Sequence, residues 1–384
     1  MSDDFLPYSK QCIDKIDLDK VISTLKSAWI TQGPAIKEFE EKVAKRVGAK
    51  YAVALSNGTT ALHLAYLALG VSKGDEVITS SNSFVATSNA ALYCGAKPVF
   101  ADIESSTGLI SVEAIKAAIT DKTKVITPVD FSGCPADLDD IQSLAKEKGL
   151  RVVQDAAHSL GATYKDSVVG DCKYADITIF SFHPVKPITT GEGGMITTND
   201  KDLYDKCCLL RSHGITKDPT ILSKNPGPWY YEMTDLGFNY RMTDIQAALG
   251  ITQLEKLDSF ITSRQEVAKF YDEAFLAVDQ INPLIIPQER TSGYHLYVLR
   301  INFEDCSITR AEMMHTLREK GIGTQVHYIP IHTQPYYQQN VCEGLILPET
   351  NRYYEMALSI PIYPFMSEHD QDRVIEAFKD CVCR

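Results

Sequence analysis

The chain has 384 residues, of which 44% are hydrophobic and 23% are charged, a composition typical of a folded protein with room for a large and a smaller domain. Its net charge of −12 argues against a nucleic-acid partner. No run of 18 apolar residues occurs, so we expect no membrane span. Residues 1–7 lack the basic and apolar regions of a signal peptide, and the ten cysteines contain no CxxC pair. We therefore expect a cytoplasmic protein without a metal site.

Short apolar runs alternate with helical patterns between residues 51 and 198. This alternation predicts an α/β fold in which a mostly parallel sheet is covered on both faces by helices. The expected strands are Tyr51–Leu55, Glu76–Thr79, Pro98–Asp102, Lys124–Pro128, Arg151–Asp155, Asp176–Ser181 and Met195–Thr198. The expected helices are Thr59–Leu69, Ser83–Cys94, Ser111–Ile119 and Leu138–Lys148.

The pattern changes after Arg241. A surface loop with three prolines, Lys217–Trp229, comes before the change, and a long helical stretch over Thr243–Ala277, with a break near Leu257–Asp258, comes after it. Further along we expect one strand and two helices, at His295–Ile301, Ile308–Lys320 and Asp370–Phe378. The chain is thus predicted to form a large domain over residues 1–242 and a smaller α+β domain over residues 243–384, connected by the long helix.

Two residues with reactive side chains stand out from their surroundings. Lys186 lies in the segment Ser181–Gly194, which holds no other lysine, arginine or acid before Glu192 and is stiffened by prolines on both sides of the lysine. A lysine kept from water has a lowered pKa and can attack a carbonyl carbon. Asp155 closes an apolar strand, at the edge where α/β sheets bind ligands, although an aspartate there can also simply cap a helix.

Two further features complete a set that suits pyridoxal 5′-phosphate (PLP). The turn Ser56–Thr60 joins a strand to a helix, so the amides of Gly58 and Thr59 are candidates to bind a phosphate. The alternative is an ordinary turn with a threonine cap. Phe84 either stacks on a cofactor ring or belongs to the core. Because PLP requires a lysine, an acid, a phosphate cradle and a contact on its ring, the four features together predict a PLP site.

The segments Asp155–His158, Ser181–Gly194 and Gly237–Met242 resemble the sugar aminotransferases of the DegT/DnrJ/EryC1/StrS family, and the resemblance runs from end to end. It implies the PLP-dependent transferase fold of type I, with Lys186 as the Schiff-base lysine and Asp155 as the partner of the pyridine nitrogen. It also implies that His158 lies beside the cofactor's phenolic oxygen and Phe84 against its ring. The phosphate would be bound by Gly58, Thr59 and Ser181.

The same resemblance implies a homodimer and a nucleotide-sugar substrate. Asn239 would bind the phosphate of the neighbouring subunit, whereas a local explanation makes Asn239 the N-cap of a helix over Met242–Leu249. Thr31, His327 and Tyr328 fall in segments that contact the sugar nucleotide in similar enzymes.

Within the family, the segments around Lys186, Leu210–Gly214 and Gln325–Tyr328 are most similar to the branch that acts in pseudaminic-acid biosynthesis. That branch implies L-glutamate as amino donor and UDP-2-acetamido-2,6-dideoxy-β-L-arabino-hex-4-ulose as acceptor. Alternatives are a different nucleotide-linked keto-sugar, a PLP-binding regulator without turnover, or another fold type I enzyme such as a desulfurase or a transaminase acting on amino acids. For the last, the candidate carboxylate-binding residues are Arg300, Arg310 and Arg318. Family members that act as dehydratases have histidine at the position of Lys186.

Overall fold

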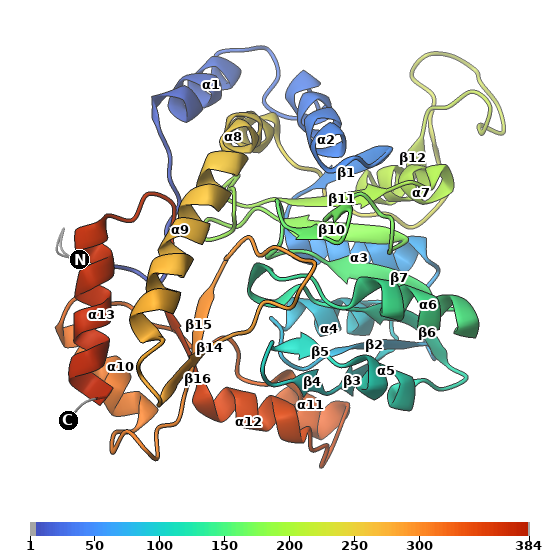
Figure 1. Cartoon of the computed structure of the whole chain (residues 1–384). Coiled ribbons are helices and arrows are strands. Elements are labelled where there is room, and N and C mark those ends of the chain that lie inside the picture. The colour runs from blue at the N-terminus through green and yellow to red at the C-terminus, as the bar shows by residue number, and fades with distance from the viewer. Residues whose placement is uncertain (1–4, 383–384) are drawn as a thin grey trace.

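The computed structural model describes residues 5–382, and a seven-stranded sheet lies at its centre (Figure 1). In spatial order its strands are β1 (Tyr51–Leu55), β11 (Gly194–Thr198), β10 (Ile177–Ser181), β7 (Arg151–Asp155), β6 (Thr123–Thr127), β2 (Glu76–Ser80) and β3 (Lys97–Ala101). β11 pairs antiparallel with both of its neighbours, and the remaining pairs are parallel. The prediction of a mostly parallel α/β sheet is therefore confirmed.

Helices cover both faces of this sheet, because consecutive strand residues point to opposite sides. In β1, Val53 and Leu55 belong to one hydrophobic cluster, and Ala52 and Ala54 belong to another. The first face is covered by α3 (Gly58–Ala68), α4 (Ala86–Tyr93) and α7 (Lys201–Arg211). The second face is covered by α2 (Pro34–Val47), α5 (Val112–Ala118), α6 (Leu138–Lys148) and α8 (Asp244–Glu255).

A second core lies beside the large sheet, around a three-stranded antiparallel sheet (Figure 1). Its strands are β14 (Ile281–Pro283), β15 (Tyr297–Ile301) and β16 (Ala357–Ile360). The helices of this part of the chain are α9 (Leu257–Phe275), α10 (Arg310–Glu319), α11 (Pro335–Asn340), α12 (Pro348–Met356) and α13 (Glu368–Val382). Two single-turn 3₁₀ helices and three short ribbons complete the fold: Phe131–Gly133, Ile331–Thr333, β4 (Ile103–Glu104) with β5 (Leu109–Ile110), β8 (Thr163–Tyr164) with β9 (Ser167–Val168), and β12 (Ile215–Thr216) with β13 (Glu232–Met233).

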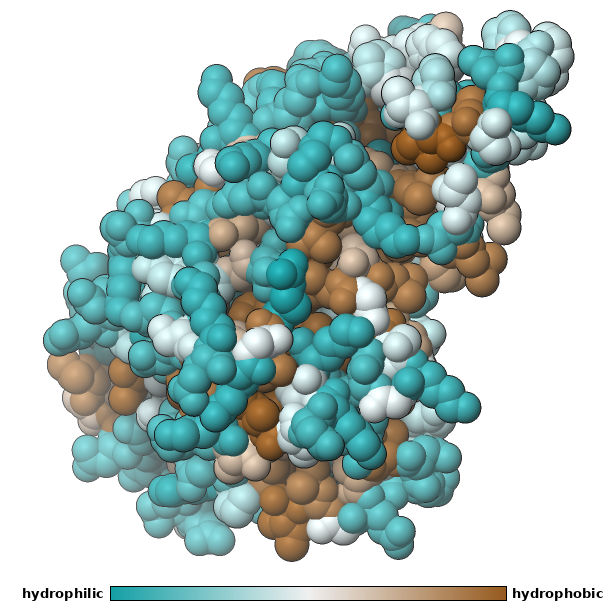
Figure 2. All heavy atoms as spheres, turned by 90° about the vertical axis from the view of Figure 1, so that its right-hand side faces the viewer, coloured by the Kyte–Doolittle hydropathy of each residue, from teal (hydrophilic) through white to brown (hydrophobic). Residues whose placement is uncertain are grey.

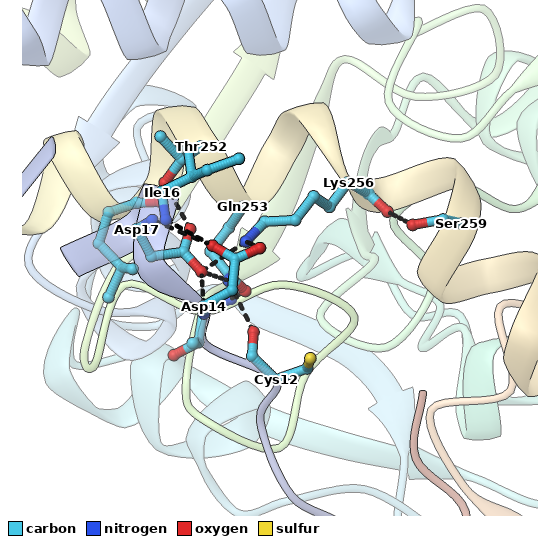
Figure 3. Close-up of polar contacts among 10 residues, drawn as sticks. Cys12, Asp14, Ile16, Asp17, Thr252, Gln253, Lys256 and Ser259 are labelled. Atoms are coloured by element: carbon cyan, nitrogen blue, oxygen red, sulfur yellow. Dashed lines mark hydrogen bonds and ion pairs between the residues drawn. The ribbon is translucent and has the colours of Figure 1, made fainter. Parts of the chain in front are cut away.

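The N-terminal helix α1 (Lys15–Leu25) is fastened to the junction of α8 and α9 by a buried carboxylate. The Asp17 side chain, which is fully buried, accepts hydrogen bonds from Thr252 at 2.6 Å and Gln253 at 2.9 Å and pairs with Lys256 at 2.5 Å (Figure 3). Lys256 separates the two helices, so the predicted break in the long helical stretch is confirmed.

Each strand and helix expected between residues 51 and 198 has a counterpart among the described elements, and so do the elements expected at His295–Ile301, Ile308–Lys320 and Asp370–Phe378. The expected helix over Ser83–Cys94 starts only at Ala86, because the preceding residues form a loop that leaves Phe84 exposed. The pattern does not predict α1, α2, α7 or α12, although α2 buries Phe39 and Val43 at helical spacing. The expected loop over Lys217–Trp229 is confirmed and projects between β12 and β13 (Figure 1).

The division into residues 1–242 and 243–384 remains a proposal. Helix α8 packs on α1 and α2, whereas Leu6 belongs to the core of the C-terminal half and exchanges backbone hydrogen bonds with Gly321 and Gly323. The proposed domains include residues 1–4 and 383–384, which lie outside the described range. Residues 1–4 are also part of the segment 1–7 that was compared with a signal peptide. No helix within residues 5–382 is long and apolar enough to span a membrane.

Candidate active site

A cavity of about 720 Å³ opens where the carboxyl ends of several sheet strands meet residues 295 and 325–329 of the C-terminal half of the chain. Nine of the eleven residues singled out from the sequence line it: Gly58, Thr59, Phe84, Asp155, His158, Ser181, Lys186, His327 and Tyr328. Asp155 and Ser181 are the last residues of the neighbouring parallel strands β7 and β10, so the sheet itself brings them together. The structure thus assembles in one place residues that are up to 270 positions apart in the sequence.

The turn after β1 has the geometry of an anion cradle. Asn57 caps α3, and its side chain accepts a hydrogen bond from the Thr60 amide at 2.9 Å. The amides of Gly58 and Thr59, in the same first turn, have no partner within the helix and remain for a ligand. A Cβ at residue 58 would lie 3.0 Å from Ser181 Cβ, so glycine permits the close approach of this turn to β10. The cap is Asn57, not a threonine.

Asp155 is a buried acid, 4% exposed, that lines the cavity. Its two oxygens accept hydrogen bonds from Thr87 Oγ1 at 2.7 Å and from the Ala157 amide at 3.2 Å. Burial raises the pKa of Asp155, and the hydrogen bonds and the charge of Lys186 oppose that shift. No helix follows Asp155, so it is not a helix cap.

Lys186 has an amine with a lowered pKa. Its Nζ lies 3.3 Å from His295 Nε2. Burial lowers the pKa of Lys186 to about 8, and the charge of Asp155 acts in the opposite direction. An amine with such a pKa is partly neutral near physiological pH, which is the state that attacks a carbonyl carbon or accepts a proton.

Three buried histidines and a tyrosine form the wall beside Lys186. The rings of His158 and His295 lie 4.3 Å apart between centroids, and Tyr328 Oη lies 3.3 Å from His158 Nε2. His327 Nδ1 lies 2.8 Å from Ser359 Oγ. Burial and the nearby charge of Lys186 lower the pKa of each histidine, that of His327 to about 3, so these rings are neutral at physiological pH.

Phe84 stands at the edge of the cavity with 59% of its surface exposed, and its ring centroid lies 6.3 Å from that of Tyr328. It is therefore not a core residue. An exposed aromatic ring at the mouth of a cavity offers a flat apolar surface to a ligand.

Thr31 and Asn239 are exposed and do not line this cavity. Thr31 forms a bridge with Thr243, and Asn239 forms one with Ser212. The explanation of Asn239 as a helix cap is wrong, because Thr243 caps α8. The role of Asn239 in a partner's site remains a proposal.

Tyr8, Thr87 and His295 are among the cavity residues that the sequence pattern does not single out. Tyr8 packs its ring 5.3 Å from that of His327, although it lies close to the N-terminus. Thr87 carries no sequence signal, because threonine in a helix is common. The only sequence feature that points to His295 is its position, as a polar residue directly before the apolar run that leads into β15.

These groups fit PLP. The first turn of α3, close to Ser181, suits a phosphate, and the buried carboxylate of Asp155 suits a cationic ring nitrogen. The lysine with its lowered pKa opens on the same cavity and suits the cofactor's aldehyde.

Comparison with known proteins gives the same result. The spore coat polysaccharide biosynthesis protein SpsC of Bacillus subtilis (strain 168) is 43% identical over 383 residues, which cover 98% of this chain and 97% of SpsC. The structure of Helicobacter pylori PseC, an aminotransferase involved in the biosynthesis of pseudaminic acid, is similar with a TM-score of 0.91 and 32% identity, covering 98% of this chain and 99% of PseC.

A second similar structure is known with both states of the cofactor. Spr1654 from Streptococcus pneumoniae in its PLP form has a TM-score of 0.90 and 31% identity and covers 98% of both chains, and its PMP form has the same TM-score. Fold and site together define a PLP-dependent aminotransferase. The family described as the DegT/DnrJ/EryC1/StrS aminotransferases matches residues 11–379, and this chain belongs to it, as a sugar aminotransferase.

Proposed function

We propose that this enzyme moves the amino group of L-glutamate to the 4-keto carbon of UDP-2-acetamido-2,6-dideoxy-β-L-arabino-hex-4-ulose, in pseudaminic-acid biosynthesis. The observation that carries the proposal is the convergence of Lys186, Asp155 and the turn at Gly58 on one cavity, in a chain similar to PseC over 98% of its length. His327 and Tyr328, from the segment most similar to that branch, line the same cavity. Because UDP-sugars and L-glutamate are metabolites of the cytoplasm, the proposal also puts the enzyme there.

Each residue has a defined task in this proposal. Bound PLP supplies an electron sink and carries the amino group between the two substrates. The amides of Gly58 and Thr59, with Ser181, hold the phosphate, and ionised Asp155 keeps the ring nitrogen protonated, because each charge favours the other. Lys186 would hold the cofactor through its amine. The same amine, when free in the cavity, would accept the proton of the donor carbon, for which a pKa of about 8 is suited.

The charges around the cavity support a homodimer. No arginine among the described residues lines it, and Lys186 is the only lysine there. In particular Arg300, Arg310 and Arg318 are not part of its wall, which counts against a dedicated amino-acid transaminase. A negatively charged nucleoside diphosphate requires cationic or amide groups, and we propose that a second copy of the chain contributes them.

The surface offers a place for that second copy. Leu236 is 75% exposed, Trp229 70% and Met233 63%, all in or beside the loop that projects from the large domain. Figure 2 views the molecule from the side that carries this loop and shows hydrophobic residues gathered beneath the upper projection. A cluster of exposed apolar side chains is typical of an interaction surface. Asn239 is exposed and forms a bridge with Ser212, three residues before β12, and we propose that it reaches the phosphate of the partner subunit.

A second candidate function rests on the relative with 43% identity. SpsC is a spore coat polysaccharide biosynthesis protein. On that basis the acceptor is another nucleotide-linked keto-sugar that serves as a precursor of a surface polysaccharide. The two candidates share the cofactor chemistry and differ only in the sugar.

The test is incubation of the purified enzyme with L-glutamate and a panel of UDP-keto-sugars of different stereochemistry, with the products identified by NMR. The proposal predicts a 4-amino product from the β-L-arabino sugar and none from the Lys186→Ala variant. Amination of only another sugar supports the second candidate. If PLP binds and no sugar is aminated, the chain is a PLP-binding regulator and the proposal is wrong.

A further inference from the structure

His295 occupies a position that the mechanism above does not use. It lies in the loop immediately before β15, 1% exposed, and its Nδ1 is 3.0 Å from the carbonyl oxygen of Val185. Since a carbonyl oxygen can only accept a hydrogen bond, the Nδ1 atom carries the proton. The other ring nitrogen, Nε2, then presents a lone pair, and it lies 3.3 Å from the Nζ atom of Lys186.

The surroundings keep this ring neutral. Burial lowers the pKa of His295 well below its usual value, and the charges of Lys186 and Arg264 lower it further. Arg264 is itself buried, and its Nη1 donates hydrogen bonds to the carbonyl oxygens of Tyr294 at 3.1 Å and Ile362 at 3.0 Å. The lone pair of Nε2 is therefore available throughout the physiological pH range.

We propose that His295 is a positioning residue for Lys186, whose amine donates a hydrogen bond to Nε2 and is thereby aimed into the cavity. The inference rests on the proposed function, in which Lys186 must stay close to the reacting carbons after the donor displaces it. A lysine side chain has four rotatable bonds, so confining its amine to a productive orientation contributes directly to the rate of proton transfer. The hydrogen bond from Nδ1 to the carbonyl oxygen of Val185, one residue before Lys186, fixes the position of the imidazole ring relative to the lysine.

The hydrogen bond also favours the charged form of the amine. Asp155 raises the pKa of Lys186, and the charge of Lys186 in turn lowers the pKa of His183. His158, His327 and Arg264 act on the pKa of His295. Removing the acceptor takes away a contact with the ammonium ion. The pKa of Lys186 should then fall below its value of about 8.

Two substitutions separate this role from simple packing. In His295→Asn, the amide nitrogen occupies the place of Nδ1 and still donates to Val185, while the acceptor facing Lys186 is lost. In His295→Gln, the longer side chain brings an amide oxygen to the place of Nε2. His332→Asn is the matched control, because His332 is equally buried, binds Ser81 Oγ at 2.8 Å through Nδ1 and does not line the cavity.

The first measurement uses the protein freed of PLP and does not depend on catalysis. Competitive acetylation with acetic anhydride across pH 6–10, followed by peptide mass spectrometry, reports the neutral fraction of Lys186. We expect a midpoint near pH 8 for the parent protein, a downward shift of about one pH unit for His295→Asn, recovery in His295→Gln, and no change in His332→Asn. An unchanged or raised midpoint in folded His295→Asn overturns the proposal.

The second measurement is kinetic. With PLP bound, His295→Asn should lower the rate of the half-reaction with L-glutamate about tenfold or more while changing the KM for glutamate less than threefold, since a positioning defect acts after binding. His295→Gln should recover most of the rate. Equal losses in both variants would assign His295 a purely structural role and contradict the proposal.

The parent protein supplies a check that needs no variant to be active or stable. Its ¹⁵N-histidine spectrum should show His295 as the neutral tautomer protonated on Nδ1, and a proton on Nε2 would overturn the proposal. Failure of the proposed function is a different outcome. In that case no keto-sugar is aminated, while the acetylation midpoint and the tautomer still show whether His295 holds the lysine.

Discussion

Replacing Asp155 by asparagine should separate catalysis from stability, with opposite effects on the two. Asp155 is 4% exposed and accepts hydrogen bonds from Thr87 and the Ala157 amide. An asparagine has the same shape, keeps an acceptor for the amide and turns its amino group toward the threonine hydroxyl, which can accept. We therefore expect Asp155→Asn to fold normally.

The loss of activity follows from the loss of charge. A hydrogen bond to a charged group contributes about 1.5–3 kcal/mol, and at 1.36 kcal/mol per decade this corresponds to about 10- to 150-fold in rate. In a site closed to water, electrostatic stabilisation of the transition state is typically larger, about 10²–10³-fold. We expect the half-reaction with L-glutamate, followed by the absorbance of the cofactor in a stopped-flow instrument, to slow by about 100-fold or more.

The stability of the protein without PLP should change in the other direction. Burial raises the pKa of Asp155 above the value of about 3.9 in an unfolded chain. The folded state therefore holds the proton more tightly, so ionisation of this carboxyl opposes folding, and stability falls as the pH rises from about 4 through the raised pKa. At pH 7.5 the neutral asparagine avoids this cost, and the melting temperature should be equal or higher. A near-normal half-reaction, or a clearly lower melting temperature, would refute the reasoning.

Four further predictions test the remaining parts of the structure. Borohydride reduction of the holoenzyme should fix PLP on Lys186, and a labelled peptide containing any other lysine excludes that assignment. Gly58→Val should raise the Kd of PLP at least about tenfold (about 1.4 kcal/mol) in equilibrium dialysis, because even a Cβ would lie 3.0 Å from Ser181 Cβ; a change below threefold speaks against the phosphate cradle. Mixing Lys186→Ala chains with Asn239→Ala chains, each inactive alone, should restore activity in heterodimers if Asn239 acts in the partner's site, and heterodimers that stay inactive rule this out. Asp17→Ala should lower the free energy of unfolding by about 3 kcal/mol in urea titrations, because it leaves buried polar partners unpaired, and a loss below about 1 kcal/mol would contradict the anchoring role.

Local patterns in the sequence were enough to predict the seven strands of the large sheet and most of the helices that cover it. The alternation in β1, where Val53 and Ala54 face different cores, and the periodic helices between residues 58 and 148 reflect burial that repeats every few residues. Asp155 and the turn at Gly58 were identifiable because strand ends in α/β sheets are ligand sites. Lys186 was identifiable because its segment carries no other cation or acid before Glu192. The family resemblance added the role of each residue.

Only the tertiary structure shows which residues from distant parts of the sequence lie next to one another. His295 lies 109 positions from Lys186, and Thr87 lies 68 from Asp155, so no periodicity within one element relates the members of either pair. The same holds for Asp17, whose burial depends on Thr252 and Gln253 in a helix more than 230 residues away. Burial and hydrogen bonding are properties of the packed chain, and the lowered pKa of the lysine follows from them. The sequence by itself thus determined most strands and helices of the central sheet and the chemistry of its strand ends, and packing decided which side chains surround the reactive amine.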